Sequence, residues 1–136
     1  MPIEGRIHER ETVRAFIQKP RQERTLLLLS NPKRRRMFTD KLAHFKWLDE
    51  RFVYPIPASV PHSVAGTVAF LRGKGAGPTV WAIAERTGLD AQELDLEFAV
   101  GETWGSCHAA ILSCIPGKLA YFRGEAMKSE CLLIHP

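Results

Sequence analysis

The chain has 136 residues, of which 45% are hydrophobic and 25% are charged, a composition typical of an ordinary globular protein. A chain of this length buries about two thirds of the surface that it exposes when unfolded. We therefore expect a single globular domain over residues 1–136. No apolar run approaches the roughly 18 residues of a membrane span, and an odd number of cysteines argues against a disulfide framework. We expect a cytoplasmic protein that does not enter the membrane.

Charge is distributed unevenly along the chain. The net charge is +4, but residues 1–54 carry 13 bases and 7 acids, whereas residues 55–136 carry 6 bases and 8 acids. Most of the acids in the second part lie in residues 85–102. The basic and acidic segments can attract each other within one fold, or between two copies of the chain in a homo-oligomer.

The first third of the chain predicts two helices separated by a strand. Apolar residues at helical spacing predict a helix over residues 9–19. The apolar run at residues 25–29 predicts a strand buried on both faces. Ser30 or Asn31 can then cap a helix over residues 32–45.

The middle of the chain continues the alternation of strands and helices. Pro55 and Pro57 confine a short strand at residues 52–56 to a sheet edge, or make this segment an extended connection. A helix is expected to follow Ser59 or Ser63 and to end at Gly73. Residues 79–84 have the composition of a central strand.

The last third predicts one helix and then a series of strands. Residues 90–100 have apolar side chains at helical spacing, and the apolar runs at residues 109–115, 119–122 and 131–135 predict an antiparallel meander. The whole order predicts an α/β fold that shades into α+β. We expect a single mixed β-sheet of about four to six strands, flanked by about three to four helices.

The most unusual local feature is a run of bases in the first turn of the helix predicted at residues 32–45. The run consists of Lys33, Arg34, Arg35 and Arg36. A helix N-terminus already carries partial positive charge, so cations there call for a negative partner. Helical geometry directs Arg34 toward the core. Beside a central strand at residues 25–29, Ser30, Asn31 and Arg34 would converge on a phosphate or carboxylate.

Three interpretations of the basic run remain open. It can be a solvated face neutralised by the acidic residues 85–102, a phosphate-binding surface for nucleic acid, or a site for a small anionic ligand. Nucleic acid is the leading specific candidate, and binding should be weakly sequence-selective because no base-reading motif is present. We expect a binding or regulatory domain rather than an enzyme. Its working surface is predicted to be Ser30, Asn31, Lys33, Arg34, Arg35 and Arg36.

A small enzyme is the alternative function, and a protein-interaction module is a further one. Cys107 could act as a nucleophile, but the adjacent His108 should point to the opposite side of an extended segment. Glu93 and Glu97 are four residues apart. On one helix face they could bind a metal or share a proton.

The remaining motifs predict neither a metal nor a cofactor. The cysteine and histidine residues of the last third lack the short CxxC spacing of a zinc site. They are Cys107, His108, Cys114, Cys131 and His135. The glycine-rich residues 73–78 end a helix and lead into a strand, the reverse of the order in a phosphate loop.

Overall fold

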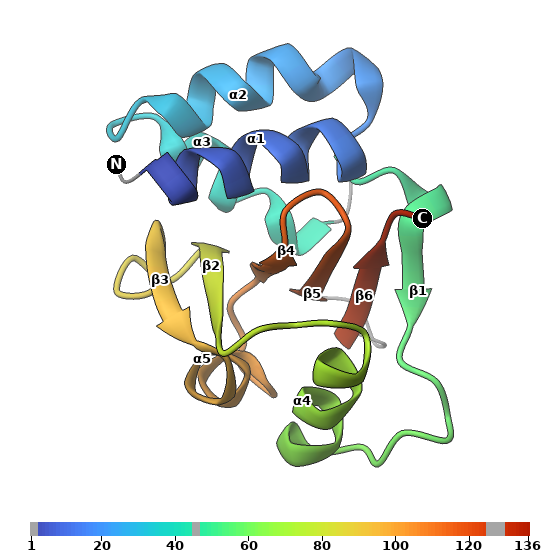
Figure 1. The fold of residues 1–136 in the computed structure, drawn as a ribbon. Coiled ribbons are helices and arrows are strands. Elements are labelled where there is room, and N and C mark those ends of the chain that lie inside the picture. Colours follow the sequence, from blue (N-terminus) through green and yellow to red (C-terminus); the bar gives the residue numbers. More distant parts are fainter. Residues whose placement is uncertain (1–2, 45–46, 125–129) are drawn as a thin grey trace.

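Six strands form one sheet at the centre of the computed structural model, which describes residues 3–44, 47–124 and 130–136 (Figure 1). The strands are β1 (Val53–Pro55), β2 (Thr79–Ala84), β3 (Gln92–Asp95), β4 (Ala110–Ile115), β5 (Leu119–Arg123) and β6 (Glu130–Ile134). Their order in the sheet is β1-β6-β5-β4-β2-β3, and each of these neighbouring pairs is antiparallel.

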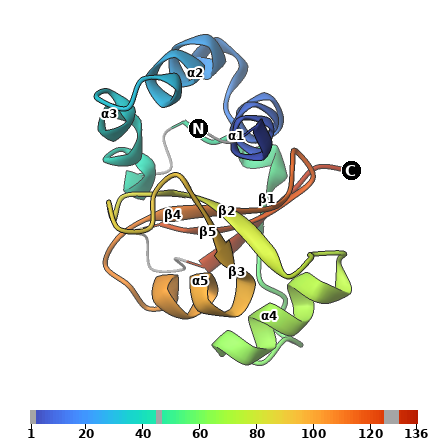
Figure 2. The ribbon, with the colours of Figure 1, turned by 60° about the vertical axis from the view of Figure 1, so that its left-hand side comes forward.

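Helices cover both faces of this sheet (Figure 2). One face carries α1 (Ile3–Phe16), α2 (Gln22–Ser30) and α3 (Arg35–Thr39), and the other carries α4 (Val64–Gly73) and α5 (Leu96–Thr103). Short 3₁₀ turns occupy Lys19–Arg21, Leu42–His44 and Glu50–Phe52. The predicted fold class is confirmed: helices pack on a single sheet, and β4, β5 and β6 form an antiparallel meander.

Side chains of each central strand alternate between two apolar cores. In β2, Trp81 and Ile83 face α1 to α3, whereas Val80 and Ala82 face α4 and α5. The helices complete the first core with Val13, Phe16, Leu28, Leu29 and Phe38, and the second with Val68, Leu71, Leu96, Ala99 and Val100. Ile17, directly after α1, also lies in the first core. Burial on both faces explains why β2 is apolar without interruption.

Several predicted elements are confirmed, with ends within one residue of the predicted ones. The strands β2, β4, β5 and β6 match the predicted runs, and β1 is the short edge strand expected from its prolines. The helix α4 begins after Ser63, whose hydroxyl accepts a hydrogen bond from the Gly66 amide at 3.0 Å. It ends at Gly73, so the glycine-rich segment terminates a helix as expected.

The prediction of a strand at residues 25–29 is wrong, because this run lies in α2. Thr25, Leu28 and Leu29 are buried, whereas 70% of the Leu27 side chain is exposed. Burial at positions i, i+3 and i+4 is the pattern of an amphipathic helix, and leucine is among the best helix formers. The run is therefore buried on one side only.

The helix predicted over residues 32–45 is much shorter, and the helix predicted over residues 9–19 begins earlier. The Asn31 carboxamide oxygen accepts a hydrogen bond from the Lys33 amide at 3.0 Å and holds a turn, so α3 starts only at Arg35. The helix α1 runs from Ile3 to Phe16. Its start was predicted too late because the residues that its first turns bury, Gly5 and Glu9, are not apolar, whereas Ile3 and Ile7 are exposed.

The helix predicted over residues 90–100 is also wrong in its first half. Residues 92–95 form the edge strand β3, which pairs with β2. The helix α5 begins at Leu96, where the Asp95 carboxylate caps it by accepting a hydrogen bond from the Phe98 amide at 3.0 Å. The cap divides a segment that the apolar spacing treats as one element.

Candidate functional site

Arg35, and not Arg34, is the buried member of the basic run. Arg35 is 5% exposed, whereas Arg34 is exposed and stands at the position before α3. The prediction that Arg34 points toward the core is wrong. The helix α3 begins at Arg35, three residues after the predicted start, so Arg34 lies outside the helix and helical geometry does not set its direction.

Arg35 lies at the centre of a buried network of charges. Its Nε and Nη2 donate to the two carboxylate oxygens of Asp90 at 2.8 and 2.9 Å, and its Nη1 donates to Glu9 Oε1 at 2.8 Å. Nη1 also donates to the Leu29 carbonyl at 3.0 Å. The second oxygen of Glu9, which is 4% exposed, accepts a hydrogen bond from Trp81 Nε1 at 2.8 Å.

This network ties together elements that are far apart in the sequence. It joins α1 through Glu9, the end of α2 through Leu29, the start of α3 through Arg35, and the loop between β2 and β3 through Asp90. Burial lowers the pKa of Arg35, but the hydrogen bonds to Asp90 and Glu9 outweigh this effect and raise the pKa above its ordinary value. The guanidinium therefore stays charged.

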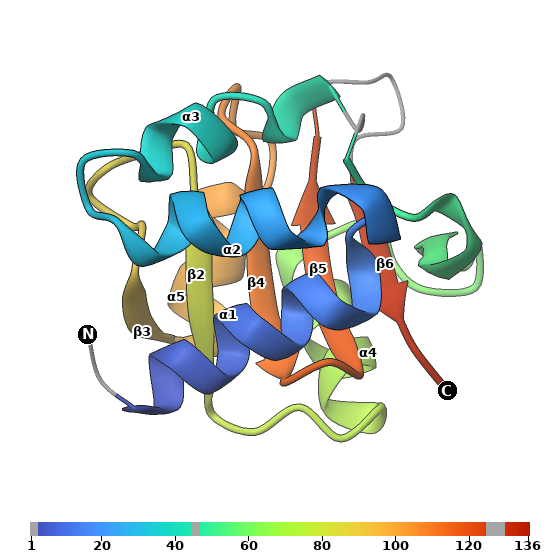
Figure 3. The same cartoon turned by 90° about the horizontal axis from the view of Figure 1, so that it is seen from above.

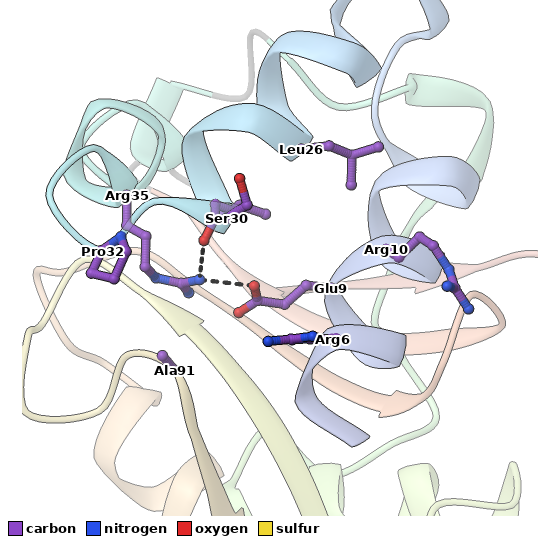
Figure 4. Close-up of a pocket in the computed structure, with 9 residues that line it drawn as sticks. Arg6, Glu9, Arg10, Leu26, Ser30, Pro32, Arg35 and Ala91 are labelled. Carbon is purple, nitrogen blue, oxygen red and sulfur yellow. Dashed lines mark hydrogen bonds and ion pairs between the residues drawn. The ribbon is translucent and has the colours of Figure 1, made fainter. Parts of the chain in front are cut away.

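A cleft of about 560 Å³ opens above this network, between α1 and the end of α2 (Figure 4). Its lining residues are Arg6, Glu9, Arg10, Leu26, Leu29, Ser30, Pro32, Arg35 and Ala91. Glu9 and Arg35 form the polar part of its interior, and Arg6 and Arg10 are exposed. Arg10 lies 3.8 Å from Glu11, whereas the Arg6 side chain has no ion pair or hydrogen bond within the described part of the chain.

A second hollow of about 520 Å³ lies on the other side of the basic run. It is lined by Arg36, Glu85, Arg86, Thr87, Gly88 and His108. Arg36 is already engaged here, since it donates to the Glu85 carbonyl at 3.4 Å and to Asp40 at 3.1 Å. The basic run thus meets the acidic residues 85–102 within one chain, at Glu85 and Asp90.

The predicted site residues are divided between these two hollows. Ser30 and Arg35 line the first, Arg36 lines the second, and Asn31 shapes the turn between α2 and α3. Lys33 and Arg34 are exposed at that turn, and neither side chain has a partner among the residues that the structure describes. Arg6 was not predicted as a site residue, because it lies before residue 9, where the helix was predicted to begin.

The charge asymmetry along the sequence becomes a difference between the two helical layers. Residues 3–44, which form the layer of α1, α2 and α3, contain eleven Lys and Arg and five Asp and Glu. The helices α4 and α5 on the opposite face contain Arg72 against Glu97 and Glu102. Figure 3 looks onto the basic layer, where α1 and α2 cross over the sheet.

The residues of the alternative enzyme site are arranged differently from the prediction. Cys107 Sγ lies 3.7 Å from His108 Nδ1, so these side chains meet and do not point apart. They meet because Gly105 has a φ of 71° and Ser106 Oγ accepts from the His108 amide, so the segment is bent and not extended. Both side chains are exposed, which leaves the pair without the water exclusion that favours covalent catalysis.

The other candidate chemical groups are kept apart by the fold. Glu93 lies in β3 and Glu97 lies in α5, where it pairs with Arg72 at 3.0 Å, so the predicted shared helix face is wrong. Cys114 and Cys131 lie in different cores, on opposite faces of the sheet, and burial raises the pKa of Cys114 to about 12. Within the described ranges, no three His, Cys, Asp or Glu side chains are grouped to hold a metal ion.

A histidine and a serine that the sequence analysis did not single out also meet under α1. His8 Nδ1 lies 2.7 Å from Ser113 Oγ on β4, and Thr12 donates to the same oxygen at 3.4 Å. Burial lowers the pKa of His8, although Glu4 opposes this effect. Ser113 is fully buried, so the pair anchors α1 to the sheet and is closed to a substrate.

The chain matches no protein-family model, no curated protein and no solved structure. Among the described residues, no helix is long and apolar enough to cross a membrane. The side chains of the basic layer and of the two hollows are therefore the features that indicate a function.

Proposed function

We propose that the protein binds nucleic acid through its phosphate backbone, using the exposed bases of the α1–α3 layer. The proposal depends most on the environment of Lys33 and Arg34. Both are exposed at the turn between α2 and α3, and their side chains have no partner among the described residues. Their neighbours Arg35 and Arg36 are already hydrogen-bonded to acidic residues. Cationic side chains without a partner can neutralise the phosphates of a nucleic acid. This releases the counterions that surround those phosphates and so favours binding.

Recognition of this kind should depend weakly on base sequence. Trp47, an aromatic residue of the same layer, packs against Phe38 at 5.5 Å and lies under Arg21 at 5.2 Å, so it is not free to stack on bases. Phosphate contacts supply affinity and register but carry no sequence information. We therefore expect similar affinity for RNA and DNA of unrelated sequences.

A salt-dependent titration tests the proposal. Labelled single strands and duplexes of unrelated sequence are titrated with the protein, with fluorescence anisotropy as the readout. Affinity should fall as a power of the salt concentration, and the double variant K33Q/R34Q should bind more weakly. Its slope of log affinity against log salt should be shallower by up to about two, one for each lost phosphate contact.

The matched control removes two bases from the opposite face. R72Q/K74Q changes the net charge by the same amount, but Arg72 and Lys74 lie at the end of α4. This variant should keep the affinity and slope of the unchanged protein. Absence of binding at low salt, or equal loss in the two double variants, would show that the turn between α2 and α3 is not a nucleic-acid surface.

A further inference from the structure

The cleft between α1 and α2 has the dimensions and the lining of a small-molecule site. Its volume of about 560 Å³ lies within the range of about 300 to 1,000 Å³ that such sites occupy. One part of its lining is apolar and comes from three separate segments of the chain. These apolar residues are Leu26 and Leu29 of α2, Pro32 of the following turn, and Ala91 before β3.

The charged groups in the interior of the cleft already satisfy one another. Both carboxylate oxygens of Glu9 accept hydrogen bonds, one from Arg35 and one from Trp81. Arg35 uses four of its five N–H groups on Asp90, Glu9 and the Leu29 carbonyl. A ligand cation would therefore find no open carboxylate at Glu9, and it would also meet two exposed arginines.

The unsatisfied charge of the cleft is positive and belongs to α1. Arg6 and Arg10 are one helical turn apart on the exposed side of the cleft (Figure 4). Arg6 has no partner within the described ranges, and the contact of Arg10 with Glu11 is long, at 3.8 Å, and exposed. Guanidinium groups bind carboxylates and phosphates through two parallel hydrogen bonds. A negative group is thus favoured at α1 and an apolar group against α2.

We infer that this cleft binds an organic anion with one apolar body and one carboxylate or phosphate group. The anionic group would contact Arg6 and Arg10, and the apolar body would lie against Leu26, Leu29 and Ala91. Arg6 and Arg10 belong to the same basic layer as the proposed nucleic-acid surface, but this site uses neither Lys33 nor Arg34, on which the nucleic-acid proposal depends.

Octanoate and octyl phosphate serve as probes, and octanamide is the uncharged control of the same length. Each is titrated into ¹⁵N-labelled protein below its micellar concentration, and amide chemical shifts are followed by NMR. We expect saturable shifts near Leu26, Ser30 and Ala91 with at least one of the two anions, and about tenfold weaker binding of octanamide. The relative affinities of octanoate and octyl phosphate identify the preferred anionic group.

Two variants separate this site from the nucleic-acid surface. R6Q/R10Q should weaken binding of the anion by about tenfold or more, because it removes the charge-assisted hydrogen bonds. K33Q/R34Q should leave that binding unchanged, even if it abolishes binding to nucleic acid. The inference is wrong if neither anion causes saturable shifts at the cleft, if octanamide binds as well as the anions, or if R6Q/R10Q has no effect.

Discussion

Arg34 and Arg35 are adjacent in the sequence and have opposite environments. Arg34 is exposed, whereas Arg35 is buried between Glu9 and Asp90. Its guanidinium donates four hydrogen bonds, two to Asp90, one to Glu9 and one to the Leu29 carbonyl. Asp90 also accepts a hydrogen bond from the Ala84 amide of β2. A buried cation between two carboxylates does not stabilise a fold merely by its presence. Its removal, however, leaves two carboxylates without their counterion.

The variant Arg35→Met should therefore lower the free energy of unfolding strongly. Removal of one partner from a buried ion pair typically costs about 3 to 5 kcal/mol, since the remaining charge is left uncompensated. The neighbouring variant Arg34→Met is the control and should change stability by less than about 0.5 kcal/mol, as an exposed position does. Urea denaturation followed by circular dichroism measures both. Equal stability of the two variants would contradict a structural role for the network.

Part of the candidate site could be predicted from the sequence. The run of four bases identified the turn between α2 and α3, and Ser30, Arg35 and Arg36 do line hollows. The partners of Arg35 could not be predicted, because Glu9 is 26 residues away and Asp90 is 55 residues away. No local pattern shows which of several acids a base meets across such separations. For the same reason, the cleft itself became visible only in the structure.

At the scale of elements, the close approach of α1 to the sheet depends on Gly5. A Cβ at this position would lie 2.5 Å from Cζ2 of Trp81 and closer still to Cη2. The indole is fully buried and its nitrogen is hydrogen-bonded to Glu9, so it has no space into which to move. A side chain at residue 5 would have to lift the first turns of α1 away from β2.

We expect Gly5→Ala to destabilise the protein by about 1 to 3 kcal/mol, the usual effect of overpacking a filled interior. The matched control is Gly101→Ala in α5, where a Cβ would have no neighbour within 4 Å. Alanine is the better helix former by about 1 kcal/mol, so this control should stabilise. Opposite signs in thermal denaturation would confirm the close packing. Stabilisation by both variants would show that α1 has room above Trp81.

The elements that could be predicted are those whose burial matches a simple period. The strands β2, β4, β5 and β6 are buried on both faces, which matches their short and almost continuous apolar runs. Such a run favours a buried strand, but a short helix can also carry one. The apolar run at residues 26–29 was predicted wrongly as a strand, because Leu27 is exposed and the run is not buried on both sides. The strand β3 has four largely exposed residues, so its place in the sheet depends on pairing with β2 and not on apolar spacing.

At the scale of the whole molecule, both apolar cores share a single sheet. Trp81 contributes to the first core, and its neighbours Val80 and Ala82 contribute to the second. If the sheet unfolded together with one helical layer, the apolar core under the other layer would therefore be exposed to water. The two layers differ in charge mainly on their outer surfaces. This difference therefore does not change how the two cores depend on the shared sheet.

We expect unfolding in one cooperative transition. In a Trp104→Phe background, tryptophan fluorescence reports on Trp47 and Trp81, which both belong to the first core, whereas far-ultraviolet circular dichroism reports on all helices. The two probes should give coincident urea midpoints. A variant in the second core, Leu96→Ala, should shift both midpoints equally. Separate midpoints would mean that the basic layer unfolds independently of α4 and α5.

The order of strands also constrains how the protein is made. The strand β6 is hydrogen-bonded on both sides, to β1 and to β5, although it comes after them in the chain. The helices α1 and α2 precede all six strands in the described part of the chain, yet they pack on Trp81 of β2, Ile111 of β4 and Leu133 of β6. Their apolar sides thus stay uncovered until residue 134 has been synthesised, so chains that stop short of β6 should be targets for chaperones and for aggregation.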